Sequence, residues 1–281
     1  MVCPTCPRAT GVLCQDLRGS RDWQDPVLGI RREATGAVGG HSDIIRSAFG
    51  VPCGGWGCAG KMAKNLKETI ERSSDKYPSY SLLTGFIGTA WISKALSDCG
   101  MSDVAYRLLS QDSFPSWLYP VKNGATTIWE RLNSYTHQDG FGKHNSMNSF
   151  NHYSFGAVAA WMYNYSLGIR RDETSPGIKH FFLQPEVDPT GHLNVAGGHY
   201  DSMYGRIESR RELKEASTEY SFTIPANTSA TVVLPAKFLK DVKVDGRKVN
   251  RRATQASLDK AKGLLKMELG SGCYQIEVAN E

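Results

Sequence analysis

Glu130 stands out in this sequence because its neighbours suit chemistry on a sugar. Trp129 precedes it, Arg131 follows it, and His152 comes 22 residues later. A guanidinium can keep a carboxylate ionised and fix its orientation, while an indole offers an apolar face to a sugar ring. The alternative is an ordinary glutamate at a helix start, beside a core tryptophan and a solvated ion pair of small value.

A polar loop follows this stretch at residues 133–149 and carries His137, Asp139 and His144. Long polar loops within compact helical domains are often functional. The three side chains also invite a metal interpretation, but their spacings of two and five residues match no familiar metal-binding pattern. We therefore expect no metal and no cofactor.

Hydrophobic spacing predicts the helices that would position these residues. Apolar side chains recur on one face of each segment, Ser102 is a natural N-cap, and Gly168 closes the last helix. Short connections between short helices indicate antiparallel neighbours, and therefore a stack of helical hairpins. The expected helices are residues 62–73, 82–96, 103–110 and 151–169.

Beyond Arg171 the pattern changes from helices to strands. Residues 172–177 are typical of a linker or turn, and β-branched or alternating segments follow, separated by Gly, Pro and Asn. Eight short strands predict an antiparallel β-sandwich of about 100 residues. The expected strands are residues 178–183, 193–195, 205–213, 219–224, 230–234, 242–244, 264–269 and 274–278.

Composition excludes several classes of protein. The chain has 281 residues, 40% hydrophobic and 10% aromatic, so it has room for one large or two medium globular domains. Its net charge of +5 comes from scattered basic residues, which argues against nucleic-acid binding. No apolar run is long enough to span a membrane. The N-terminus lacks the apolar core of a signal peptide, so the cytoplasm is the default location.

The cysteines do not indicate a disulfide framework. There are seven, an odd number, and four of them lie within the first 53 residues. Cys3 and Cys6 have zinc-like spacing but lack a convincing second pair. We expect free thiols, and we expect residues 1–59 to be a poorly ordered or unassigned leader.

Residues 124–131 (GATTIWER), 147–153 (MNSFNHY) and 156–158 (GAV) closely resemble α-L-rhamnosidases of glycoside hydrolase family 78. The resemblance extends over roughly residues 60–279. It implies a multidomain α and β chain, with part of an (α/α)6 six-hairpin barrel at residues 60–171 and a C-terminal antiparallel β-sandwich at residues 172–281. It also implies rhamnose-containing oligosaccharides or glycosides as partners.

The resemblance also implies roles for individual residues. The family hydrolyses terminal α-L-rhamnose with inversion, which needs a general acid and a general base on opposite sides of the sugar. The matching positions make Glu130 the base and His152 a contact to a rhamnose hydroxyl. Trp129 and Asn151 would support or line the site, with packing and helix capping as the alternatives.

The family's general acid lies upstream, in a segment that begins Cys-Pro-x-Arg and ends Gly-Trp-x-Gly-Asp. Residues 3–8 and 55–57 echo parts of it without its carboxylates, so no acid is assigned. We expect a truncated chain with impaired or no activity alone. A non-catalytic sugar-binding or structural fragment and another six-hairpin glycosidase stay open as alternatives.

A partial barrel would leave apolar helix faces uncovered. We expect such faces near Trp91, Trp117 and Trp161, and self-association through them, because large exposed apolar patches mark contact surfaces.

Overall fold

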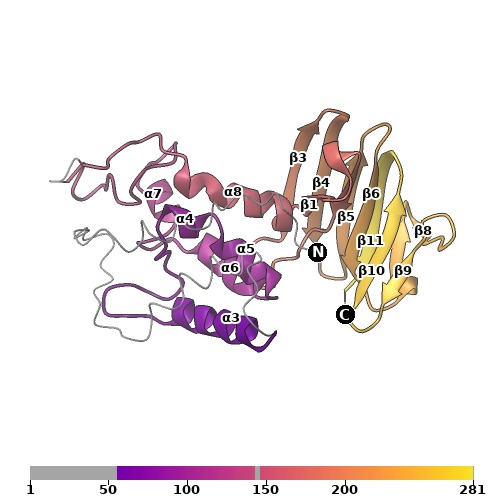
Figure 1. Cartoon of the computed structure of the whole chain (residues 1–281), viewed down its shortest axis with the longest axis horizontal. Helices are drawn as coiled ribbons and strands as arrows, with labels where there is room; N and C mark the ends of the chain where they lie inside the picture. Colours follow the sequence, from indigo (N-terminus) through magenta and orange to yellow (C-terminus); the bar gives the residue numbers. More distant parts are fainter. Residues whose placement is uncertain (1–55, 143–145, 281) are drawn as a thin grey trace, which may run out of the picture. The chain divides into compact units, whose positions relative to one another are not determined.

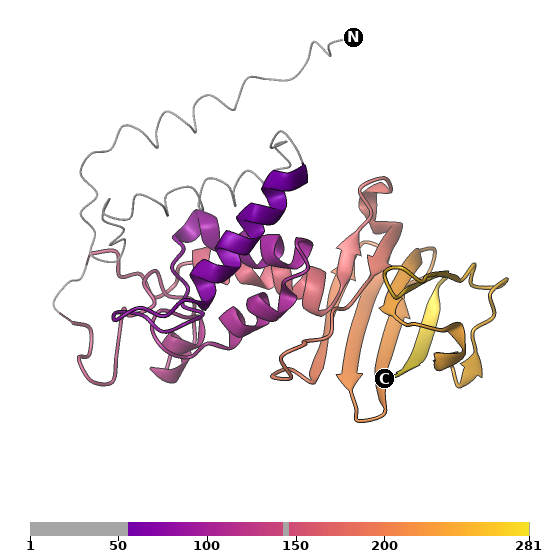
Figure 2. The same cartoon turned by 90° about the horizontal axis from the view of Figure 1, so that it is seen from below.

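Eight short helical segments precede the strands in the computed structural model, which describes residues 56–142 and 146–280. The expected leader is almost wholly outside these residues, as are Cys3 and Cys6. Figures 1 and 2 show the helices gathered in one part of the described chain and the strands in another. The helical segments are α3 (Trp56–Glu71), α4 (Phe86–Thr89), α5 (Ile92–Asp98), α6 (Ser102–Ser110), α7 (Leu118–Lys122), η2 (Ser154–Ala157), α8 (Val158–Trp161) and η3 (Met162–Ser166).

The helix expected over residues 82–96 is wrong in its extent, because the structure divides it into α4 and α5. The Thr89 hydroxyl donates to the Gly85 carbonyl oxygen at 3.0 Å and lies 2.9 Å from the Thr84 hydroxyl. Threonine hydroxyls compete with the backbone for hydrogen bonds in this way, and Gly85 and Gly88 add flexibility that disfavours a continuous helix.

Residue Ser102 begins α6, but the predicted cap is wrong. Met101 occupies the N-cap position, and no side chain caps the helix. The Ser102 hydroxyl instead donates to the Glu186 carboxylate and lies 2.8 Å from Ser97 Oγ, within hydrogen-bond distance. A residue that looked like a local cap is therefore a long-range contact, which residue type alone does not reveal.

The long helix expected over residues 151–169 is shorter and less regular. A 3-10 turn, α8 and a π-helical turn succeed one another between Ser154 and Ser166. Residues 151–153 are not helical, because the His152 N–H donates to the Ile128 carbonyl oxygen at 2.8 Å. At the other end the Leu167 N–H donates to the Met162 carbonyl at 2.9 Å, and Gly168 follows with φ of +71°.

The strands form two sheets that share one apolar core. All neighbouring strands pair antiparallel except β2 and β6, which are parallel. The five-stranded sheet runs β1 (Ile169–Arg171), β2 (His180–Leu183), β6 (Ser229–Pro235), β10 (Leu264–Leu269), β9 (Ser257–Asp259). The six-stranded sheet runs β3 (Val195–Ser202), β4 (Gly205–Leu213), β5 (Ser217–Ile224), β11 (Gly272–Ala279), β7 (Val242–Val244), β8 (Arg247–Lys248).

Alternation along the strands builds this core. In β5, Tyr220, Phe222 and Ile224 point inward, while the residues between them face outward. They meet apolar side chains of the opposite sheet, including Phe181 and Leu265. Burial of such side chains contributes about 1.5–3 kcal/mol each, so the sandwich has the core that its sequence pattern predicts.

The helices have a second core of their own. Trp117 and Trp161 are themselves buried, at 9% and 3% exposed, whereas their chain neighbours Leu118, Met162 and Tyr163 are 36%, 40% and 41% exposed. Trp117 donates its indole N–H to the Phe155 carbonyl at 2.8 Å, and Trp161 donates to Ser97 Oγ at 2.9 Å. Other exposed apolar side chains of the helical part are Leu83, Ile87, Val121, Ile128, Phe141, Met147 and Tyr153.

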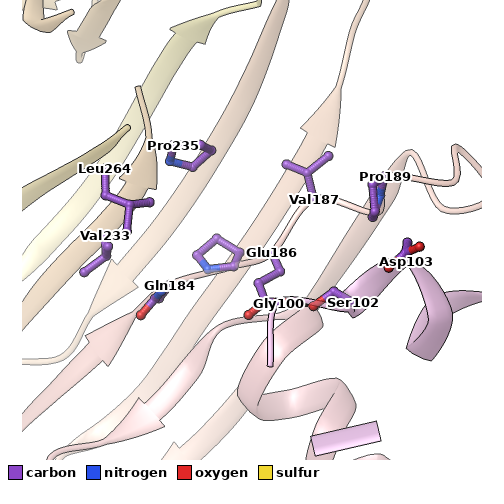
Figure 3. Close-up of a pocket in the computed structure, with 11 residues that line it drawn as sticks. Gly100, Ser102, Asp103, Gln184, Glu186, Val187, Pro189, Val233, Pro235 and Leu264 are labelled. Carbon is purple, nitrogen blue, oxygen red and sulfur yellow. Dashed lines mark hydrogen bonds between the residues drawn. The ribbon is translucent and has the colours of Figure 1, made fainter. Parts of the chain in front are cut away.

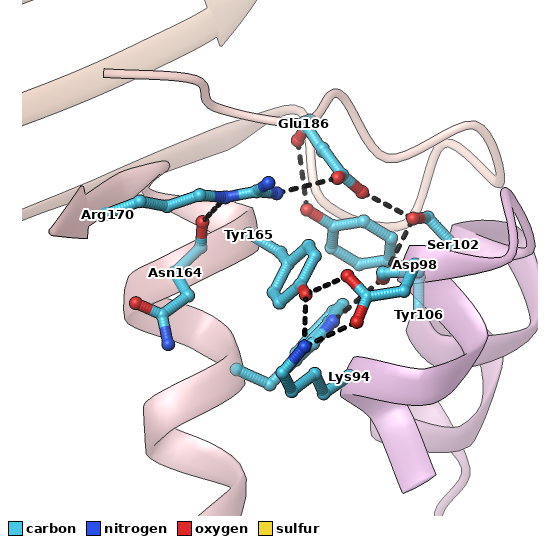
Figure 4. Close-up of polar contacts among 10 residues, drawn as sticks. Lys94, Asp98, Ser102, Tyr106, Asn164, Tyr165, Arg170 and Glu186 are labelled. Atoms are coloured by element: carbon cyan, nitrogen blue, oxygen red, sulfur yellow. Dashed lines mark hydrogen bonds and ion pairs between the residues drawn. The ribbon is translucent and has the colours of Figure 1, made fainter. Parts of the chain in front are cut away.

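Polar contacts connect the helices to the sandwich, and Figure 4 shows those around Glu186. The Glu186 carboxylate accepts hydrogen bonds from the Ser102 hydroxyl and, at 3.0 Å, from Arg170 Nη2. The Tyr106 hydroxyl donates to the Glu186 carbonyl at 3.0 Å and accepts from the fully buried Arg211 at 3.2 Å. These hydrogen bonds offset the free-energy cost of removing the polar groups from water.

In the described part of the chain, no helix is both long enough and apolar enough to cross a membrane. The predicted boundary between residues 171 and 172 stays a prediction. Strand β1 lies just before it and pairs with β2 through Ile169 and Leu183.

We predict that Gly168→Ala destabilises the protein far more than Gly263→Ala. Both glycines have positive φ, +71° and +61°, but a Cβ on Gly168 would lie 2.0 Å from the Pro185 nitrogen, whereas one on Gly263 would meet nothing within 4 Å. The strained backbone alone costs about 1–2 kcal/mol, and the clash should bring Gly168→Ala above about 3 kcal/mol. Urea unfolding of both variants measures this; equal losses would show that the chain relaxes at Gly168.

A second prediction concerns pH. Burial raises the pKa of the Glu186 carboxyl above its ordinary value of 4.5, against the opposing effects of Ser102 and Arg170. The folded state therefore holds this proton more tightly than the unfolded chain. Glu186 contributes stability that is fully present below its unfolded pKa and is lost as pH rises through the higher folded pKa.

From pH 4.5 upward, the free energy of unfolding of the unaltered protein should therefore fall relative to that of Glu186→Gln. Unfolding by urea at a series of pH values gives the difference between the two curves. Glu173→Gln, at an exposed ion pair with Arg171, is the matched control. Parallel curves for the unaltered protein and Glu186→Gln would contradict the prediction.

Candidate functional site

Backbone hydrogen bonds pair the two sequence motifs. The Glu130 N–H donates to the Ser149 carbonyl at 2.9 Å, and the His152 N–H donates to the Ile128 carbonyl at 2.8 Å. The Thr127 hydroxyl adds a bond to the Phe150 carbonyl. The segments around residues 128–130 and 149–152 therefore lie side by side, although a loop of polar sequence separates them.

The carboxylate of Glu130 is held by this pairing. Its Oε2 accepts the Ser149 N–H at 3.0 Å, so the two residues are joined through both backbone and side chain. Glu130 is partly exposed. A carboxylate with one oxygen fixed by a backbone donor and the group still open to solvent can accept a proton from a water molecule.

A further bond crosses between the motifs at the next residue. Arg131 Nη2 donates to Asn148 Oδ1 at 3.2 Å. The guanidinium therefore helps to hold the segment that carries Glu130 against the segment that carries His152. Its position next to Glu130 in the sequence did not suggest this role.

Trp129 is a buried packing residue next to Glu130. Its side chain is 6% exposed, and its ring meets those of Phe150 and Tyr135 edge to face, with centroids 5.2 and 6.5 Å apart. An indole buried in this way packs the segment and offers no open face to a sugar. This is the packing alternative that the sequence left open.

His152 lies in a row of aromatic rings. Its ring stacks on Phe86, with centroids 4.8 Å apart and planes at 24°, and lies parallel to Tyr153 at 5.7 Å and 2°. Its Nδ1 accepts the Ser154 N–H at 3.4 Å. In the neutral ring the proton is then on Nε2, which can donate to a hydroxyl oxygen.

Asn151 is exposed, and its N–H donates to Ser149 Oγ at 3.3 Å. The following 3-10 turn has Tyr153 at its N-cap and no side-chain cap, so Asn151 does not cap it. Its role in lining a site stays a prediction.

The polar loop is closed by its own backbone. Thr136 and Gly140 exchange two hydrogen bonds, of 3.0 and 2.9 Å, and the Asp139 N–H donates to Thr136 Oγ1 at 2.9 Å. His137 donates its N–H to Asn123 Oδ1 at 3.0 Å, and His144 lies outside the described residues. Across residues 56–142 and 146–280, no three His, Cys, Asp or Glu side chains gather as around a metal ion.

Three neighbours of Glu130 and His152 were assigned no role from the sequence: Phe86, the backbone N–H of Ser149, and Tyr153. Phe86 lies 66 residues before His152 in a helix assigned only by its apolar spacing, and a backbone donor has no signature in residue type. Tyr153 was visible, as part of the motif that contains His152.

A hollow of about 600 Å³ lies elsewhere, between α6 and the five-stranded sheet (Figure 3). Apolar side chains dominate its wall, and Glu186 and Ser102 bond to each other there. Glu130 and His152 are not among its lining residues, so we place the candidate site at the paired motifs, where the chemistry lies. The lining residues are Gly100, Ser102, Asp103, Gln184, Pro185, Glu186, Val187, Pro189, Val233, Pro235 and Leu264.

Known proteins resemble the chain over both parts of the fold. The family model of the bacterial alpha-L-rhamnosidase six-hairpin glycosidase domain matches residues 58–166, and that of the bacterial alpha-L-rhamnosidase C-terminal domain matches residues 168–248. An alpha-L-rhamnosidase of Formosa agariphila is 34% identical over 196 residues, which are 70% of this chain and 21% of that protein. One of Streptomyces avermitilis is 39% identical over 157 residues, 56% of this chain and 15% of that protein.

Solved structures agree with the sequence relatives. The Streptomyces avermitilis alpha-L-rhamnosidase complexed with L-rhamnose matches with a TM-score of 0.70 and 31% identity, over 85% of this chain and 21% of that one. The Aspergillus terreus enzyme gives 0.68 and 28%, over 85% and 24%. The chain thus spans about a fifth of the length of these relatives. Because the two family models together take in well over half of the chain, in the order of its helices and strands, the chain belongs to the α-L-rhamnosidase family as part of a helical barrel followed by a β-sandwich.

Proposed function

We propose that this chain carries the base-bearing part of a site for inverting hydrolysis of terminal, non-reducing α-L-rhamnose from rhamnosides. The observation that carries the proposal is the pairing of the two motifs, which fixes the Glu130 carboxylate through the Ser149 N–H. The family membership and the L-rhamnose bound to the Streptomyces avermitilis relative support the same substrate.

Glu130 is the proposed general base. As water attacks the anomeric carbon, a new carbon–oxygen bond forms, Glu130 takes the water's proton, and the glycosidic bond breaks. The oxygen anchored by Ser149 keeps the carboxylate oriented, and the other oxygen is the proposed acceptor of the proton. His152 Nε2 would donate to a rhamnose hydroxyl, with its ring set by Phe86 and by the Ser154 N–H.

The leaving oxygen needs a proton from a second carboxyl group. In inverting enzymes this group stands about 6.5–9.5 Å from the base, and the sequence assigns no such acid. We therefore propose impaired or no turnover by this chain alone. Binding of rhamnose-containing glycosides without hydrolysis is the second candidate function, and the absence of an assigned acid favours it.

The test is hydrolysis of p-nitrophenyl α-L-rhamnopyranoside by the purified 281-residue chain. Any measurable rate should fall about 10²- to 10⁴-fold in Glu130→Gln, because general base catalysis contributes that much. Glu173→Gln, at an exposed carboxylate of the linker, should keep the rate. The first sugar released should be the β-anomer by NMR.

A rate unchanged in Glu130→Gln would contradict the assignment of the base. No turnover by the unaltered chain, together with L-rhamnose binding in an NMR titration, would establish the binding function instead.

We also propose that the chain self-associates through its exposed apolar side chains. Ile87, Val121 and Phe141 are 58%, 58% and 60% exposed, and apolar surface removed from water contributes about 25 cal/mol per Å². Sedimentation velocity should show an average mass that grows with concentration over the micromolar range. Ile87→Glu with Val121→Glu should lower that mass, and a monomer at every concentration would contradict self-association.

A further inference from the structure

Tyr153 has the most exposed large apolar side chain in the helical part of the described structure, at 85%. Its backbone is fixed at the start of η2, where its carbonyl accepts the Gly156 N–H at 2.8 Å. Its ring lies parallel to that of His152, with planes at 2° and centroids 5.7 Å apart. The ring therefore has an aromatic neighbour, while most of its surface faces solvent.

Nothing in the fold requires this ring. Within residues 56–142 and 146–280, the Tyr153 hydroxyl makes no hydrogen bond, and the side chain belongs to neither apolar core. Single exposed apolar side chains are common. This one differs because it adjoins the residue proposed to contact the sugar.

A sugar site needs an aromatic face, and Trp129 does not provide one. That indole is 6% exposed and covered by Phe150 and Tyr135. Phe86 is partly buried and packs its ring against Phe155 as well as His152. Of the rings around His152, Tyr153 is the one with an open face.

We propose that Tyr153 is the stacking platform for the terminal pyranose, a role that rests on the proposed function. A 6-deoxy sugar such as L-rhamnose carries a methyl group and carbon-bound hydrogens that can lie against an aromatic ring, while its hydroxyls point away from that ring. His152, beside the platform, then meets a hydroxyl. Stacking and hydrogen bonding come from adjacent residues of one motif, so a single backbone segment sets both.

The test is titration of L-rhamnose into the full 281-residue chain, followed through aromatic-ring resonances by NMR. Tyr153→Ala should weaken binding about tenfold, the usual order for an aromatic contact. Tyr153→Phe keeps the ring and should bind like the unaltered chain, since the hydroxyl has no partner. Tyr200→Ala, at a 43%-exposed tyrosine of β3 in the sandwich, is the matched control and should also bind normally.

Two further measurements distinguish the loss of stacking from a loss of fold stability and from the loss of the His152 hydrogen bond. The urea midpoint of Tyr153→Ala should match that of the unaltered chain, because so exposed a ring contributes little to the fold. His152→Phe keeps an aromatic ring beside Tyr153 but removes Nε2, so it should weaken binding on its own.

Normal binding by Tyr153→Ala, with weakened binding by His152→Phe, would overturn the platform and leave the proposed function standing. Equal weakening by Tyr153→Ala and Tyr153→Phe would overturn the stacking role in favour of the hydroxyl. An unaltered chain that does not bind L-rhamnose would overturn both the platform and the binding part of the proposed function.

Discussion

The candidate site depends on the backbone pairing of residues 128–130 with residues 149–152. Two N–H to carbonyl bonds, of 2.9 and 2.8 Å, align the segments, and a third backbone donor holds the Glu130 carboxylate at 3.0 Å. Each such bond contributes only about 0.5–1.5 kcal/mol net. Their value here is geometric, because they fix a carboxylate and an imidazole relative to one another without using the side-chain atoms proposed for chemistry. The irregular start of the following helix is a consequence, since His152 gives its N–H to the pairing.

Buried polar groups between the helices and the sandwich also need partners in fixed positions. Arg211 is fully buried and donates to the Leu193 carbonyl and to the Tyr106 hydroxyl, at 3.1 and 3.2 Å. Leaving such a group without partners would cost several kcal/mol, so helix α6, which supplies Tyr106, is coupled to strand β4, which supplies Arg211. Glu186 repeats the arrangement with Ser102 and Arg170. Burial dominates the pKa of Glu186, which rises despite the neighbouring guanidinium.

The sequence predicted the sandwich better than the helices, for a physical reason. Alternation within a strand reports directly which side is buried, and residues 205–213, 242–244 and 264–269 are strands with the expected ends. Strands β1, β8 and β9, each of two or three residues, were missed. The strand expected at residues 193–195 is also wrong, because it shares only Val195 with β3, whose Gly197 and Gly198 are residues depleted in strands. The helical segments 82–96 and 151–169 have the right apolar composition, but bonds from Thr89 and to Ile128 interrupt them. In the site, the motifs gave Glu130 and His152, whereas contact with Phe86 depends on chain folding over 66 residues.

The roles of the aromatic residues show why residue type alone was insufficient. Trp129 and Tyr153 each adjoin a functional candidate, and the sequence left the indole either as a sugar-facing surface or as a packing residue. Burial favours the packing role, because Trp129 fills the space under the paired segments while Tyr153 stays 85% exposed. A ring that packs against Phe150 stiffens the segment that carries Glu130. An aromatic residue can support a carboxylate or meet a ligand, and one side chain rarely does both, since each use covers the same faces. With Trp129 packed and Tyr153 exposed, the paired segments combine a buried ring next to Glu130 with an accessible ring next to His152.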